Sequence, residues 1–391
     1  MAFDPALLSG PLADEVAALT LVDHHVHGAL RAAVDRPTFE SMITEAPVAP
    51  RECSQFDSQL GFAIRRWCAP LLGLPAHAAA DDYWAARTEL GNDEANRRLL
   101  TATGTGTFLL ETGYLGATVL DPVGHAAASG ATVCEVVRLE TVAEQYLAEC
   151  GSAAEFVDGY PARLAVATAQ AVAVKSILAY RHGFDIPADR PDRTAVRRAV
   201  ETLLRLSTEA GTGHRISDAV VLRFLLWCGV DRGLPIQLHA GYGDPDLDLH
   251  RADPLLLTGW LRRVAPTGVR VMLLHCYPFH RQAGYLAQVF DHVYFDIGLG
   301  VNHVGVQSRQ LIAESLELAP FHKQLFSSDA WGPAELHLLG SWLWRRGMSS
   351  VLGQWVDQGD WSRADAVRVL ELISAGNARR VYGLAKDEVK A

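Results

Sequence analysis

The chain has 391 residues, of which 49% are hydrophobic and 20% are charged, so it can bury a large core without disulfide bonds. Its 45 acidic and 35 basic residues give a formal net charge of -10, and no run of lysine or arginine offsets that charge. Such a surface would repel a phosphate backbone, so we expect no nucleic-acid partner.

The N-terminal residues lack a basic segment followed by a long apolar one, and no stretch of the chain reaches about 18 uncharged apolar residues. We therefore expect neither export nor membrane insertion. The six cysteines form no CxxC pair, and several lie in apolar stretches, where a free thiol behaves as a small hydrophobic group. A reducing cytoplasm is the compartment that this pattern favours.

The expected elements begin with a short helix at 14–19 and a buried strand at 20–26. Residues 31–103 carry helical patterns and no convincing strand, which predicts a helical insertion. Seven further apolar runs predict strands at 106–113, 131–140, 171–177, 235–241, 269–276, 292–300 and 323–330. Helices are expected between them at 141–150, 159–170, 193–210, 253–264, 280–289, 307–318 and 333–347.

This repeated alternation of strand and helix is typical of a closed parallel barrel, and the glycine fingerprint of a dinucleotide-binding sheet is missing. We predict an α/β fold, a (β/α)8 TIM barrel formed by residues 1–391 as a single domain, with the insertion at about 31–103. Beyond it, Ser362 is placed to cap a C-terminal helix, with Asp365 at the third helical position.

Residues of the metal-ligand type end several predicted strands. The first strand ends in DHHVH, where alternation places His25 and His27 on one face. His239, His275 and Asp329 end the strands at 235–241, 269–276 and 323–330. Because the carboxyl ends of barrel strands meet at one mouth, these side chains are expected around one cavity.

Each residue alone has an ordinary explanation, since a histidine near a strand end is usually a hydrogen-bonded core or surface residue and an aspartate there is often a helix cap. The coincidence on four strands favours a metal site instead. Imidazole and carboxylate ligands without thiolates suit a divalent metal, most simply Zn, with Mn or Fe as alternatives, and the number of ions, one or two, stays open.

The order DxHxH, His, His and SD resembles the amidohydrolase superfamily. The segments KSILAYRHGFDI, IQLHAGYGDPDLDL, LLHCYPFHRQAGYLA and SSDAWGPAELHLLG are similar to its amidohydrolase-2 branch, near the amidohydrolase domain of FluG-type proteins. The resemblance implies that His25 and His27 bind the more buried ion together with Asp329. It also implies that His239 and His275 bind a second ion or contact the substrate.

Lys175 ends the strand at 171–177, at the position where some members of the superfamily carry a carbamylated lysine that bridges two metals. Burial among cations would favour the neutral amine that reacts with carbon dioxide. A protonated lysine that binds a substrate carboxylate, or one that reaches solvent, are the other interpretations.

Substrate contacts are expected from the loops that follow the strands. Tyr180 and Arg181 follow Lys175, and Tyr277 follows His275. Arg181 would suit a substrate carboxylate, or it is an ordinary loop arginine paired with Asp185.

The function predicted for the chain is metal-dependent hydrolysis of a C–N bond of the amide type. The resemblance favours a small carboxylated substrate such as a γ-glutamyl amide. Asp329 would take the proton from the attacking water and pass it to the leaving nitrogen. A metal-dependent decarboxylase or isomerase on the same barrel and a metal-binding protein without catalysis are the rivals. Barrel enzymes of this type often associate, so a homo-oligomer is a further expectation.

Overall fold

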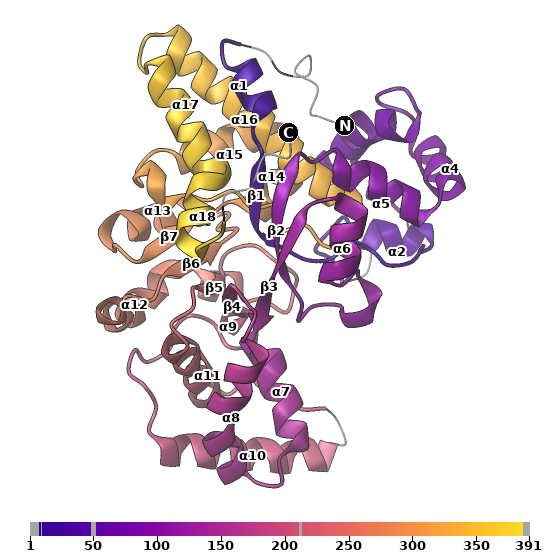
Figure 1. Cartoon of the computed structure of the whole chain (residues 1–391). Coiled ribbons are helices and arrows are strands. Elements are labelled where there is room, and N and C mark those ends of the chain that lie inside the picture. Colours follow the sequence, from indigo (N-terminus) through magenta and orange to yellow (C-terminus); the bar gives the residue numbers. More distant parts are fainter. Residues whose placement is uncertain (1–7, 9, 48–51, 211–212, 386–391) are drawn as a thin grey trace.

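A computed structural model describes residues 8, 10–47, 52–210 and 213–385, and a parallel β-sheet lies at its centre (Figure 1). Neighbouring strands in this sheet follow the order of the chain. They are β1 (Leu21–Val26), β2 (Thr105–Glu111), β3 (Thr132–Arg138), β4 (Ala173–Ser176), β5 (Ile236–His239), β6 (Val271–Leu274) and β7 (Val293–Phe295).

The eighth predicted strand takes its place in the barrel as an irregular segment. Residues 324–330 lie between β7 and β1, because Leu325 N donates to Phe295 O over 3.0 Å and His24 N donates to Phe326 O over 3.1 Å. Asp329 N donates to His25 O over 3.1 Å, and His27 N donates to Ala330 O over 2.8 Å. These bonds join the two edges of the sheet, so the predicted α/β barrel is confirmed.

Helices connect successive strands, as a barrel requires. Before β2 they are α1 (Ala13–Ala18), α2 (Arg36–Ser41), α3 (Gln59–Ala63), α4 (Ala80–Leu90) and α5 (Asn92–Thr101). From β2 to β5 they are α6 (Pro122–Ser129), α7 (Leu139–Glu149), α8 (Ala153–Ala167), α9 (Leu178–Arg181), α10 (Arg193–Ala210) and α11 (Ala219–Asp231). Beyond β5 they are α12 (Thr258–Val264), α13 (His280–Val289), α14 (Gly298–His303), α15 (Ser308–Ser315), α16 (Ala334–Asp357), α17 (Arg363–Glu371) and α18 (Asn377–Tyr382).

The segment between β1 and β2 contains α2 to α5 and, in the described residues, no strand, and it lies to one side of the sheet (Figure 1). A buried cluster fixes it to the barrel: Arg87 Nε donates to Glu335 Oε1 over 2.6 Å, and the Tyr83 hydroxyl donates to the same oxygen over 2.9 Å. Glu335 lies in the first turn of α16. The helices after β1 are therefore held against the helix that follows the eighth segment.

The C-terminal helices return to the first strand. Ser362 caps α17, accepting from Asp365 N over 3.0 Å, as its sequence predicts. α18 packs on strand residues that include Val22 and Met272, and the Tyr382 hydroxyl lies 2.8 Å from His24 Nδ1. Among the described residues, no helix is both long and apolar enough to cross a lipid bilayer.

Candidate metal centre and pocket

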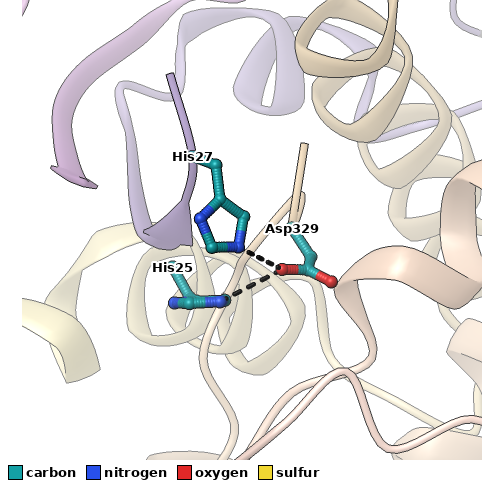
Figure 2. A group of neighbouring side chains, drawn as sticks. All are labelled: His25, His27 and Asp329. Carbon is teal, nitrogen blue, oxygen red and sulfur yellow. Dashed lines mark ion pairs between the residues drawn. The ribbon is translucent and has the colours of Figure 1, made fainter. Parts of the chain in front are cut away.

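Three predicted ligands come together at the carboxyl end of the barrel. His25 Nε2 lies 3.1 Å from Asp329 Oδ1, and His27 Nε2 lies 3.7 Å from the same oxygen. One donor atom from each of the three side chains lies within 4.8 Å of the others. Figure 2 shows both imidazole rings turned toward the Asp329 carboxylate. This set of two nitrogens and one carboxylate oxygen fits a divalent ion of the zinc, manganese or iron type.

The remaining nitrogens of the two rings have fixed acceptors. His25 Nδ1 lies 2.9 Å from Gln237 Oε1, and His27 Nδ1 lies 3.1 Å from Glu111 Oε2. Since an ionised carboxylate and an amide oxygen can only accept, each Nδ1 carries a proton, and Nε2 is the nitrogen that each ring can offer to a metal. The Gln237 amide nitrogen in turn donates to His24 O over 2.7 Å, which settles which end of that amide faces His25. Partners of this kind orient metal-binding histidines in proteins.

Glu111 is itself held by Arg138. The Arg138 guanidinium donates to both Glu111 oxygens, over 3.2 and 2.5 Å. Burial alone would raise the pKa of the Glu111 carboxyl, but Arg138 and His27 outweigh burial and hold that pKa well below its usual range. Glu111 is therefore an ionised acceptor for the His27 ring.

His239 and His275 face the same centre. His275 Nε2 lies 3.5 Å from Asp329 Oδ2, and the rings of His239 and His275 are 4.3 Å apart between centroids. Among the described residues, His239 Nε2 and both ring nitrogens of His275 lack a hydrogen-bond partner. Burial lowers the pKa of both imidazoles, so they are neutral. Buried lone pairs without a donor are the groups that a bound cation would satisfy.

Lys175 reaches into the centre rather than toward solvent. Its Nζ lies 3.0 Å from His25 Nε2, and the residue is 2% exposed. Burial lowers the pKa of this ammonium group to about 8, although the Asp329 and Glu111 carboxylates partly oppose the shift. The interpretation of Lys175 as a side chain that extends to solvent does not fit this position.

Two of the candidate ligands lie on a strained backbone. His275 has φ of +40° and Asp329 has φ of +49°, in the left-handed region that residues other than glycine rarely adopt. Such conformations cost of the order of 1–3 kcal/mol each and persist where the surroundings fix them. Asp296 helps to fix the backbone of His275, because His275 N donates a hydrogen bond to Asp296 Oδ1 over 2.9 Å. Strain of this kind is common at functional sites.

A cavity of about 210 Å³ opens beside these residues. It is lined by the candidate ligands His27, Lys175, His239, His275 and Asp329, and by Glu45, Tyr114, Arg138, Ile177, Tyr180, Arg181, Arg215, Asp244, Asp246, Leu299 and Trp331. Two of the three predicted substrate contacts, Tyr180 and Arg181, therefore face it. Tyr277 is absent from its lining and stacks on His280, with ring centroids 6.2 Å apart.

Arg181 pairs with a different residue from Asp185, the partner that the sequence suggested. It donates two hydrogen bonds to Glu144, over 2.8 and 3.4 Å, whereas Asp185 pairs with Arg251 over 2.7 Å. The pairing of Arg181 with Asp185 was thus wrong, because Gly183 turns the chain between them and brings Asp185 against Arg251. A substrate carboxylate at Arg181 would share that guanidinium with Glu144.

Several residues of the centre were not predicted. Glu111 ends β2 just as His239 ends β5, so Glu111 too is a ligand-type residue at the carboxyl end of a strand. Gln237 is a polar residue between two apolar residues of β5 and, two residues before His239, it shares the face of that histidine. Arg138 ends β3 and so occupied a comparable position, but Glu45 gave no such signal, because it lies on the loop after α2.

Residues 135–384 match the family model of the amidohydrolase-2 type, described as amidohydrolase. The chain is 30% identical over 237 residues to the protein fluG of Emericella nidulans, a match that covers 58% of this chain. It covers only 27% of fluG, so the chain spans about a quarter of that relative.

Solved structures share the fold over nearly the whole chain. A crystal structure from Lactobacillus casei ATCC 334, proposed to be a metal-dependent hydrolase, matches with a TM-score of 0.83 at 25% identity over 96% of this chain and 98% of its own. A glucuronate isomerase from Caulobacter crescentus matches with a TM-score of 0.63 at 15% identity, over 99% of this chain and 98% of its own. The second likeness is one of fold alone. With a family model covering most of its length and the barrel centre described above, the chain belongs to the amidohydrolase-2 family and is an enzyme of the amidohydrolase superfamily.

Proposed function

We propose that the protein is a metal-dependent hydrolase that cleaves a C–N bond of the amide type in a small carboxylated substrate. A γ-glutamyl amide is the substrate that the resemblance to FluG-type proteins favours. The observation that carries the proposal is the convergence of His25, His27 and Asp329 donor atoms within 4.8 Å of one another beside an open cavity.

His25, His27 and Asp329 would hold the divalent ion, for which we propose zinc. A bound ion of this type lowers the pKa of a water toward neutrality and polarises a carbonyl. His239 and His275 would hold a second ion or the substrate carbonyl. The cytoplasm as compartment, the lack of a nucleic-acid partner and association into a homo-oligomer stay predictions.

The proton transfers are assigned to Asp329. Its Oδ1 faces His25 and His27, while its Oδ2 faces His275, 3.5 Å from Nε2. A carboxylate between these groups can accept a proton from the attacking water and deliver it to the leaving nitrogen. Tyr180 and Arg181, which line the cavity, would orient the substrate.

The test is hydrolysis of a panel of γ-glutamyl amides and other small carboxylated amides in water enriched in ¹⁸O. We expect release of an amine and one ¹⁸O atom in the new carboxylate, loss of activity after chelation, and recovery with Zn, Mn or Fe. Asp329→Asn should lower the rate by about 10²–10⁴-fold. The exposed Asp357, at the end of α16, supplies the control variant Asp357→Asn. Carbon dioxide release or isomerisation of a sugar acid, without ¹⁸O in a carboxylate, would contradict the assignment.

A further inference from the structure

The arginines that line the cavity are already neutralised. Arg138 pairs with Glu111 over 2.5 Å, Arg181 with Glu144 over 2.8 Å, and Arg215 with Asp246 over 3.1 Å. The first two pairs are largely buried, so their carboxylates cannot leave without stranding a buried charge. Arginine therefore adds little unopposed positive charge to this cavity.

Glu45 is an acidic group in the same cavity without a cationic partner. Among the described residues, the one basic side chain within ion-pair distance of its carboxylate is His303, whose Nε2 lies 3.5 Å from Glu45 Oε1. Burial lowers the pKa of His303 to about 4, so that imidazole is neutral near pH 7. Burial raises the pKa of Glu45 to about 7, and the Asp329 and Asp244 carboxylates add to the rise. The Glu45 side chain is 15% exposed and lines the cavity, where a ligand could reach it.

Asp244 is the second such group. It makes no ion pair among the described residues, and the Arg215 beside it pairs with Asp246 instead. One of its oxygens accepts from Asp246 N over 2.8 Å. Burial raises the pKa of Asp244, as does the charge on Asp246, while Arg215 lowers it.

Neighbouring groups also suit a cation with hydrogen-bond donors. Tyr114 and Tyr180 line the cavity, and aromatic faces attract ammonium groups. The Tyr180 hydroxyl accepts from Asp244 N over 3.3 Å, which fixes the ring beside that carboxylate. His239, 5% exposed, lines the same cavity, and its Nε2 has no hydrogen-bond partner within the described part of the chain, so this nitrogen can accept from a ligand.

We propose that the substrate carries an ammonium group, which Glu45 and Asp244 bind while the scissile amide lies at the metal centre. This inference rests on the proposed amide hydrolysis and narrows its substrate class to small amides with a positively charged amine. A γ-glutamyl amide fits this class, because it carries an ammonium group beside its carboxylate.

Two matched pairs of probes, whose members differ in that ammonium group alone, test the inference. L-glutamate and glutarate are titrated into the metal-loaded enzyme by calorimetry, and γ-L-glutamyl p-nitroanilide and glutaryl p-nitroanilide are compared in turnover. We expect L-glutamate to bind about tenfold or more tightly than glutarate, as a charge-assisted hydrogen bond predicts. Glu45→Gln and Asp244→Asn should each reduce that preference. Asp248→Asn, on the same loop with a 70% exposed side chain, removes one negative charge without touching the cavity and should keep it.

The outcomes separate the two proposals. A preference for L-glutamate that both variants diminish supports the ammonium site even where neither anilide is hydrolysed, and that result would contradict only the amide hydrolysis. Equal binding of L-glutamate and glutarate, no binding of either at millimolar concentration, or a preference unchanged in both variants would overturn the ammonium site. Thermal unfolding of each variant checks that it is folded.

Discussion

His27 and His25 are oriented by different acceptors, a carboxylate for one and an amide for the other. Loss of such a partner typically weakens metal binding by about 10–100-fold, because the ring loses its fixed tautomer and direction. Glu111→Gln should therefore lower metal affinity by about that factor. The measurement is a competition titration against a chromogenic chelator.

Glu135 provides the matched control. It lies in the neighbouring strand β3 and accepts from the Thr112 hydroxyl over 2.8 Å, and it is not part of the cavity lining. Glu135→Gln should leave metal affinity unchanged. Equal affinity for Glu111→Gln and the wild type would show that the carboxylate does not orient His27.

The predicted role of Lys175 as a bridging carbamate bears on how many ions the centre would hold. Lys175 Nζ lies 3.0 Å from His25 Nε2, so a carbamate formed on Lys175 Nζ would lie among the candidate ligands. We predict that Lys175→Ala lowers the number of ions bound per chain, measured by elemental analysis. Unchanged metal content together with a raised KM would instead assign Lys175 to the substrate carboxylate.

At the scale of elements, α16 connects both ends of the barrel. Near its start, His337 Nε2 donates to His27 O over 3.0 Å, beside the metal centre. Farther along, the buried Arg345 donates to the carbonyls of Val16, Leu19 and Gly104 over 2.8, 2.9 and 3.2 Å. These carbonyls lie just before β1 and β2, at the end of the barrel opposite the site.

Arg345 should therefore matter for stability rather than for chemistry. Arg345→Met would leave buried carbonyls unsatisfied and should lower the free energy of unfolding by about 2–4 kcal/mol, measured by urea denaturation. Metal affinity of the folded protein should not change. Arg368→Met is the control, since the Arg368 side chain is 59% exposed and pairs with Asp365 of its own helix over 3.6 Å. A stability equal to that of this control would contradict the role given to Arg345.

For the whole molecule, alternating apolar runs predicted the barrel because each parallel strand is buried on both faces and carries a continuous apolar stretch. The helix predicted at 280–289 matches α13 at both ends. The eighth strand was predicted as regular, but Asp329 adopts positive φ, and Ser328 N donates to the Asp23 carboxylate over 3.0 Å. Side-chain contacts of this kind replace part of the strand pairing, and no local pattern reveals them.

The site was predictable to the extent that it depends on strand ends. HxH alternation and the convergence of strands placed His25, His27 and Asp329 together, because both follow from backbone geometry. Residues that depend on loop paths were not predictable: Arg181 reaches Glu144 on α7, and Glu45 reaches His303 on α14. The metal roles of the histidines stay predictions.

The most direct test of the central claim is metal content per chain, by elemental analysis of protein purified without added metal. The wild type is compared with a variant that carries both His25→Asn and His27→Asn, and with the exposed-site control His250→Asn. The account predicts a divalent ion bound in the wild type and in the control, and its loss in the double variant. Wild-type protein without a bound ion, or equal metal content in all three proteins, would contradict it.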